Sequence, residues 1–210
     1  YHFRYFASDI IEFCGSNPSS LLLIIDVICE ALLPIDLNGM GVSVLIFKTD
    51  GKLNVDELIT ILRQKLSSHI GSNYTELDSL LNNLLNNLFI LEIYDATQFY
   101  TTIHNLDNIL LEHRNISLVL FDTLTAFYWS EQGFKLAKMD FYVKKILRMV
   151  SNITKEYKVI FIYTRPEYFS SNKDFNVPTK HVRLYMVQNR FLNKKNKLIL
   201  ILIIIILYRM

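Results

Sequence analysis

Short apolar runs alternate along the chain with longer stretches in which apolar residues recur every three or four positions. The short runs have the length and composition of buried strands, and the longer stretches have the period of an amphipathic helix. The runs predicted to be strands are 9–14, 42–50, 88–94, 116–122 and 158–164. The segments predicted to be helices are 20–33, 55–66, 74–88, 98–113 and 133–157.

Strands separated by helices of this length imply right-handed crossovers, so we expect an α/β fold with a mainly parallel twisted sheet and helices on both faces. Ligands of such sheets bind beyond the carboxyl ends of the strands. We therefore expect polar residues to gather at this edge. The residues at the predicted strand ends are Cys14-Gly15, Thr49-Asp50, Tyr94-Asp95, Asp122-Thr123 and Thr164-Arg165.

The whole chain, residues 1–210, is predicted to form one domain, because no internal repeat or linker divides it. Residues 1–8 are rich in aromatic side chains, which are predicted either to contact a partner chain or to join the core. The segment 170–180 reads as a polar loop, and a C-terminal β-hairpin is expected to follow it, with the turn "NKKN" at its tip.

The apolar tail 198–210 is the second arm of that hairpin in the favoured interpretation, a final strand of the sheet. Its apolar run is about half of the ~20 residues that a spanning helix needs, and isoleucine favours extended structure. A membrane anchor and a tail foreign to the native protein stay open as alternatives.

Composition and charge narrow the classes of function that the sequence supports. The formal net charge is +2, which does not indicate tight DNA binding by the chain alone. The five histidines are scattered and show no zinc-ligand spacing, so no zinc is expected. Cys14 and Cys29 fit buried thiols in a reducing compartment, and no nucleophile motif is present.

The stretch "IIEFCGSNPSSLLLIIDVICEALLP", residues 10–34, has the layout of a phosphate-binding loop between a strand and a helix. Gly15 stands at the first glycine of G-x-x-x-x-G-K-[ST], but Ser20 replaces the second glycine, Leu21 the lysine and Leu22 the hydroxyl. Pro18 removes one amide donor. Because a charge-assisted contact contributes about 1.5–3 kcal/mol, loss of the lysine weakens phosphate binding tenfold or more. An ordinary strand–turn–helix is the alternative.

Asp122 ends the hydrophobic strand in "LVLFDTLTAFYW", residues 118–129. In ATPases, the aspartate that orients magnesium stands at the end of such a strand. An aspartate at this position is also a common helix N-cap, so both interpretations stay open.

These stretches, together with "VSVLIFKTDGKLNVDELITILRQKL" (42–66) and "VQNRFLNKK" (187–195), resemble the RecA-type recombinase core of the eukaryotic recombinase paralogues. The resemblance extends from about Asp9 to about Lys195. It implies a RecA-like P-loop NTPase core and a nuclear role in repair of DNA double-strand breaks by homologous recombination. The implied partners are sister paralogue subunits and, through their complex, single-stranded or branched DNA, with no membrane. The complex would assist the recombinase filament on single-stranded DNA.

The resemblance also assigns positions to ATP and magnesium, although the loop lacks its lysine and hydroxyl. The ATP-loop position is taken by Gly15, Ser16, Asn17, Pro18, Ser19, Ser20, Leu21 and Leu22. Asp122 takes the position of the magnesium aspartate, Asp50 that of the catalytic acid and Arg165 that of a phosphate-sensing residue. Asp50-Gly51 is equally well explained as a turn dipeptide. For Arg165-Pro166, a solvent-exposed end of the strand is favoured over a phosphate-sensing role. Gly15 and Asp122 are expected side by side at neighbouring strand tips.

Further candidates have a structural and a functional interpretation. Tyr128 and Trp129 are favoured as core or partner-facing aromatics over base-stacking residues. The cations near the hairpin are favoured as solubilising residues over DNA contacts; they are Lys180, Arg183, Arg190, Lys194, Lys195 and Lys197. Glu131 and Asp140 show no partner for acid–base work.

Three hypotheses follow from the sequence. The first is a RecA-like scaffold subunit of a DNA-repair complex that does not hydrolyse ATP. The second is an active DNA-dependent ATPase of the same fold, and the third is a protein tethered to a membrane by its tail.

Overall fold

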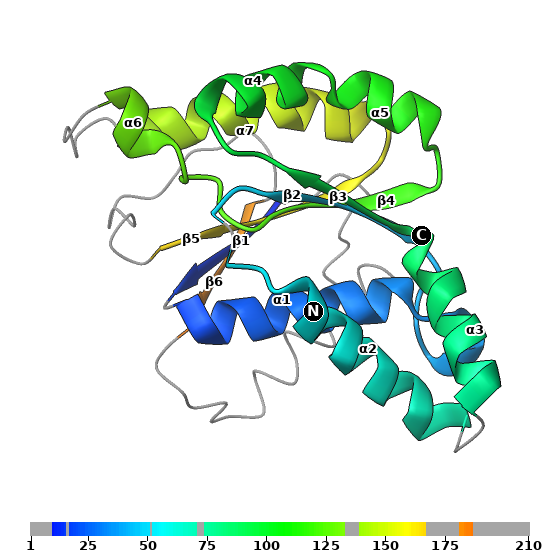
Figure 1. The fold of residues 1–210 in the computed structure, drawn as a ribbon. Helices are drawn as coiled ribbons and strands as arrows, with labels where there is room; N and C mark the ends of the chain where they lie inside the picture. The colour runs from blue at the N-terminus through cyan, green and yellow to red at the C-terminus, as the bar shows by residue number, and fades with distance from the viewer. Residues whose placement is uncertain are drawn as a thin grey trace, which may run out of the picture.

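The computed structural model describes residues 10–15, 17–50, 52–70, 74–132, 139–166 and 181–186 (Figure 1). Its strands are β1 (Ile10–Gly15), β2 (Ser43–Lys48), β3 (Leu88–Glu92), β4 (Ile116–Phe121), β5 (Ile160–Arg165) and β6 (His181–Met186). Its helices are α1 (Asn17–Leu32), α2 (Val55–Ile70), α3 (Tyr74–Leu85), α4 (Ala96–His104), α5 (Leu106–Glu112), α6 (Tyr128–Gln132) and α7 (Met139–Glu156), with a 3-10 turn at Ile35–Leu37.

The strands form one sheet in the order β3-β2-β4-β5-β1-β6, and all of the pairings among the described strands are parallel. The predicted α/β fold is therefore confirmed. Its β1, β4 and β5 are near-continuous apolar runs, as expected of parallel strands that are covered on both faces. β6 overlaps the segment predicted as the first arm of the C-terminal hairpin. The turn and the second arm lie outside the described residues, so the hairpin stays a prediction.

The helices form two layers, one on each face of the sheet (Figure 1). α1, α2 and α3 cover one face, where they pack against residues such as Phe13, Ile46 and Leu120. α4, α5, α6 and α7 cover the other, where Phe47, Phe121 and Phe161 contribute large aromatic side chains. Successive strand residues point to opposite faces, so each of the strands β1 to β5 supplies both cores.

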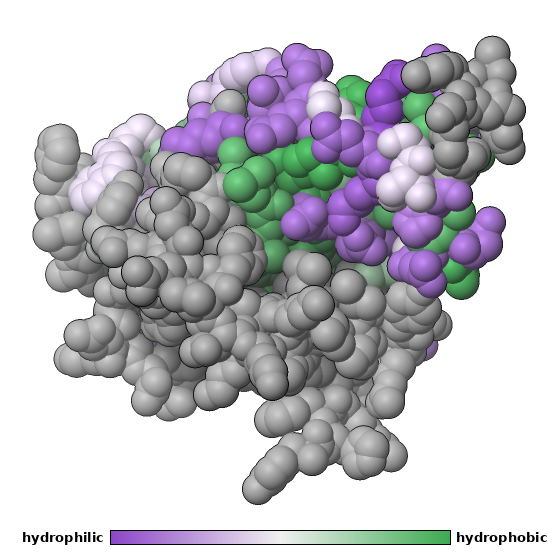
Figure 2. Space-filling view, turned by 90° about the horizontal axis from the view of Figure 1, so that it is seen from below, coloured by the Kyte–Doolittle hydropathy of each residue, from purple (hydrophilic) through white to green (hydrophobic). Residues whose placement is uncertain are grey.

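The leucines that recur every three or four positions along α2 and α3 form stripes that face the core. Leu58, Leu62 and Leu66 of α2 are fully buried, and Leu77 and Leu81 of α3 are nearly so. Figure 2, seen from the side of α1 to α3, shows an area of hydrophobic surface with hydrophilic residues along part of its border. On this layer the side chain of Leu22 is 47% exposed.

One helix prediction was wrong in detail, and one short helix was not predicted. The helix predicted over 98–113 is two helices, because the chain breaks at Asn105, which ends α4 and precedes α5. Asparagine is a good residue for such an end, since it competes with helical backbone bonds. The short α6 was not predicted, because its apolar and aromatic residues continue the run that follows β4.

No helix among the described residues is long and apolar enough to cross a membrane. The apolar tail 198–210 and the lead-in 1–8 lie outside the described residues.

Candidate functional site

Buried polar residues gather where β2, β4 and β5 end, at the carboxyl edge of the sheet. We call them the Asp122–threonine cluster; its members are Thr49, Asp122, Thr123, Thr125 and Thr164, and each is at most 9% exposed. The cluster lies at this edge because the buried apolar runs of the three strands stop in register and the next residues are polar. Beneath it, the rings of Phe47 and Phe121 stack with centroids 4.2 Å apart.

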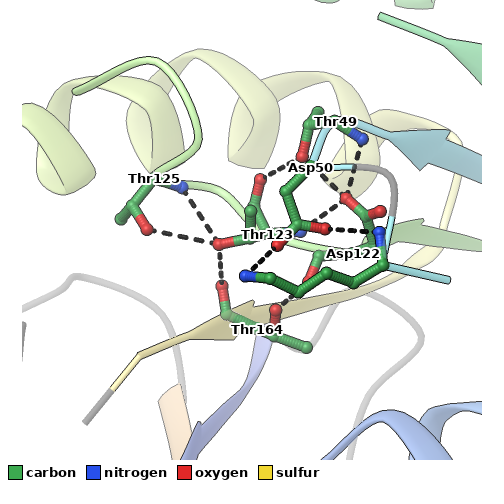
Figure 3. Close-up of polar contacts among 7 residues, drawn as sticks. Thr49, Asp50, Asp122, Thr123, Thr125 and Thr164 are labelled. Carbon is green, nitrogen blue, oxygen red and sulfur yellow. Dashed lines mark hydrogen bonds and ion pairs between the residues drawn. The ribbon is translucent and has the colours of Figure 1, made fainter. Parts of the chain in front are cut away.

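One oxygen of the Asp122 carboxylate is saturated with hydrogen bonds (Figure 3). Its Oδ1 accepts from the Thr49 backbone N–H at 2.7 Å and from the Thr49 hydroxyl at 2.7 Å. The Thr123 backbone N–H donates to the same atom at 2.7 Å. Because Thr49 follows β2 and Asp122 follows β4, these bonds join two strands and fix the orientation of the carboxylate.

The threonines extend the network to β5. The Thr164 hydroxyl donates to the backbone carbonyl of Asp122, and the Thr49 hydroxyl also lies 2.6 Å from the carbonyl of Thr123. The hydroxyls of Thr123 and Thr125 are 3.2 Å apart. Such a network holds the three strand ends rigid relative to one another.

The second oxygen of Asp122, Oδ2, is buried and has no hydrogen-bond partner among the described residues. Burial raises the pKa of Asp122 to about 6 against the lowering effect of the Thr49 hydrogen bonds, and the nearby charge of Asp50 raises it further. A buried carboxylate oxygen without a donor is costly. The arrangement suits a ligand that brings a proton donor or a hydrated cation to this oxygen.

Asp50 has the turn role that its sequence indicated. Its Oδ1 accepts from the Lys52 backbone N–H at 3.1 Å, and its Oδ2 pairs with the Lys52 ammonium at 2.6 Å. The side chain is 17% exposed, so it faces the edge of the cluster rather than its interior. Its role as a catalytic acid stays a prediction.

The Gly15 turn does not form an open loop in the described backbone. β1 runs to Gly15 and α1 already begins at Asn17, whereas the sequence placed the helix start at 20. Pro18 lies in the first turn, where a missing N–H breaks no helical hydrogen bond. Leu21 therefore lies more than one turn inside α1, where it packs against the core.

Gly15 and Asp122 are at the same edge of the sheet, but the expectation that they occupy neighbouring tips was wrong. β5 pairs with both β1 and β4, so it lies between them. With strands spaced by about 4.8 Å, the two tips are about 10 Å apart. Strand order depends on long crossovers, which the local pattern does not specify.

Arg165, at the end of β5, is buried rather than a solvated strand exit, so that interpretation was wrong. Its Nε lies 2.7 Å from Oε1 of Glu12, and both residues are 1% exposed. The Tyr163 hydroxyl donates to the other Glu12 oxygen at 2.8 Å. Parallel register places Glu12 beside Tyr163 and Cys14 beside Arg165, so the ion pair crosses from β1 to β5.

Sequence reasoning missed Glu12. The available signal was a single charge inside the apolar run "IIEFC", which a buried strand tolerates only with a partner. Arg165 is that partner, and the sequence alone did not show that β5 would lie next to β1.

The remaining predicted residues do not join the cluster. Tyr128 is fully buried, which agrees with the favoured core interpretation. Glu131 accepts hydrogen bonds from Tyr100 and Tyr142 at 3.1 and 3.4 Å, so it joins α6 to α4 and α7. The side chains of Asp140 and of Arg183 are outside the described set, as are Lys180, Arg190, Lys194, Lys195 and Lys197.

Comparison with known proteins agrees with the resemblance drawn from the motifs. The chain is similar to the DNA repair protein XRCC2 of Mus musculus, with 22% identity over 170 residues. The similar region covers 79% of this chain and 59% of XRCC2, so the chain spans less than two thirds of that relative. No protein-family model matches the chain.

The parallel sheet with helices on both faces is consistent with the RecA-like core that this relationship implies. The residues present fit only half of an ATP–magnesium site. The free oxygen of Asp122 is suited to a hydrated cation, but Leu21 and Leu22 offer no charge or hydroxyl to phosphates. Within the described ranges, no group of three or more acidic, histidine or cysteine side chains could hold a metal by itself.

Proposed function

We propose that this protein acts in repair of DNA double-strand breaks by homologous recombination, as a subunit of a recombinase-paralogue complex that assists the recombinase filament on single-stranded DNA. The observation that carries the proposal is the Asp122–threonine cluster, placed at the carboxyl edge of a parallel α/β sheet in a chain similar to DNA repair protein XRCC2. This role places the protein in the nucleus.

The subunit is a scaffold that does not hydrolyse ATP. Phosphoryl transfer depends on cations that neutralise the charge of the phosphates. At the Gly15 end of the edge, the first two turns of α1 present leucines in place of a lysine and a hydroxyl. Asp122 then serves mainly to tie β2 to β4 through Thr49.

A partner surface is available at the other end of the sheet. Among the described strands β3 pairs only with β2, so its outer edge can take a further strand. Beside it lies an open groove of about 690 Å³, which is lined by Leu91, Thr101, Thr102, His104, Asn105 and Ile109. We assign this groove to an extended apolar segment of a sister paralogue subunit.

Co-expression of the chain with sister paralogues, followed by capture and size-exclusion chromatography, tests the proposed function. Thr101→Arg adds a long charged side chain to the groove and is expected to reduce capture at least tenfold. Thr97→Arg is the matched control, because Thr97 is an exposed threonine of α4 outside the groove lining. Failure of the unmodified chain to associate with any paralogue contradicts the proposal.

Nucleotide binding with and without magnesium separates the scaffold from the active ATPase. A scaffold shows no turnover at any ATP concentration. Micromolar ATP affinity together with DNA-stimulated turnover overturns the scaffold role and supports the ATPase.

A further inference from the structure

The exposed side of α7 is basic along most of its length. The acidic residues of α7, Asp140 and Glu156, lie next to its two ends, and the stretch between them carries Lys144, Lys145, Arg148 and Lys155. Lys145, Arg148 and Lys155 are exposed, and Lys144 is half-buried. These positions recur at helical spacing, so they lie on one face of the helix. We call this the basic face of α7.

An aromatic side chain stands at the N-terminal end of this face. Phe141 is 69% exposed, and Lys144, Lys145 and Arg148 follow at three, four and seven positions along the helix. On another side of α7, the partly buried Met149 and Ile153 pack against the core. Phe141 therefore presents a large exposed aromatic surface at the end of this row of cations.

The cations of the opposite helical layer have a different arrangement. Arg63 of α2 pairs with Asp78 of α3 at 2.6 Å. Lys65 of α2 pairs with Glu30 of α1 at 2.5 Å and lies 3.4 Å from Asp26. On that layer these cations form ion pairs between neighbouring helices. On α7, the exposed Lys145 lies over the ring of Tyr100, with its Nζ 4.7 Å from the ring centroid.

We infer that the basic face of α7 binds single-stranded DNA, with the cations on successive phosphates and Phe141 stacked on an unpaired base. Single-stranded nucleic acid is held by this combination of a positive track and an aromatic platform. The stretch from Phe141 to Lys155 is about 21 Å long at 1.5 Å per residue. That length follows several phosphates, which are about 3.4 Å apart along a stacked strand. The inference rests on the proposed function and adds a DNA-contact surface of this subunit itself.

The test measures binding of the full chain to fluorescent oligo(dT) by anisotropy over a series of salt concentrations. Lys145→Glu with Arg148→Glu is expected to lower the affinity at least tenfold. It is also expected to reduce the slope of log affinity against log salt by about 1.4, because each contact to a single strand contributes about 0.7. Arg114→Glu with Lys158→Glu is the matched control, since both residues are exposed and the change in net charge is the same; it should leave the slope near that of the unmodified chain.

Phe141→Ala separates base stacking from charge. It is expected to reduce binding to oligo(dT) about tenfold and to leave the salt slope and the affinity for a blunt duplex unchanged, since stacking needs an unpaired base. Equal effects of the α7 and control reversals on affinity and slope overturn the inference, and so does the absence of salt-dependent binding by the unmodified chain. Loss of paralogue capture with unchanged DNA binding also overturns it, because the face then binds an acidic protein surface. Capture of sister paralogues by the unmodified chain upholds the proposed function in each of these cases.

Discussion

The carboxyl edge of the sheet has two halves with opposite chemistry. Beyond β2, β4 and β5, the buried carboxylate of Asp122 is surrounded by threonine hydroxyls and backbone N–H groups. Beyond β1, the chain passes almost directly into α1, where Leu21 packs into the core and Leu22 is exposed. The first half can receive a polar ligand, and the second lacks the charge that a triphosphate needs.

The boundary between the two halves is the ion pair of Glu12 and Arg165, which joins β1 to β5. The two halves of this edge are therefore held by different contacts. On the Asp122 side, hydrogen bonds between strand ends fix the carboxylate. On the Gly15 side, α1 begins directly after the strand, and Leu21 packs against the core.

The largest expected effect is at this boundary. Arg165→Met leaves the Glu12 carboxylate buried without its cation and should lower the free energy of unfolding by about 3–5 kcal/mol. The double variant Glu12→Leu with Arg165→Met removes both charges and should recover most of that loss. Denaturant unfolding of the two variants and the unmodified chain measures the difference; a loss below about 1 kcal/mol for the single variant would show that water reaches the pair.

The next largest effect is a dependence of the free energy of unfolding on pH, which arises from Asp122. The pKa of Asp122 is raised from 3.8 to about 6, so between these values the folded state binds more protons than the unfolded state. Stability therefore falls as pH rises through this interval, by on the order of 3 kcal/mol, and is constant above it.

Asp122→Asn removes this titration. The free energy of unfolding of the unmodified chain minus that of the variant should fall between about pH 4 and pH 6, which urea unfolding over a pH series measures. Parallel profiles of the two proteins would contradict the raised pKa.

A smaller effect is expected from the hydroxyl that joins β2 to β4. Thr49→Val removes the hydrogen bond to Asp122 Oδ1 and should cost about 1–3 kcal/mol, because the acceptor is a buried charged group. Thr60→Val is the control, since the Thr60 hydroxyl bonds only to a carbonyl of its own helix at an exposed position. Thermal unfolding compares the two variants, and equal losses would mean that the cluster adds nothing to stability.

The smallest effect is expected from restoring the phosphate half. Leu21→Lys with Leu22→Thr installs the missing side chains, but both positions are inside α1 and away from its first N–H groups. The affinity for ATP and magnesium, measured by calorimetry, should rise by less than about tenfold. A larger gain would show that residues 15–22 form a phosphate loop when nucleotide binds.

Several features of the fold could be predicted because they depend on local patterns. The apolar runs indicated β1 to β5 within one or two residues, and the leucine stripes of α2 and α3 indicated their buried faces. Asp122 was recognised because a carboxylate directly after a buried strand is conspicuous in sequence. The start of α1 was less predictable, because Pro18 suits a loop and the first turn of a helix equally well.

The amino-acid sequence alone specifies three features: the alternation of strands and helices, the polar character of the strand ends and the lack of a lysine between Gly15 and Leu22. These follow from residue identity and periodicity, which act over a few neighbouring positions. Only the tertiary structure decided that β5 lies between β1 and β4, that Thr49 holds Asp122, and that Glu12 pairs with Arg165. The reason is physical: these partners are brought together by strand order, which depends on how whole helices pack across the sheet rather than on any local pattern.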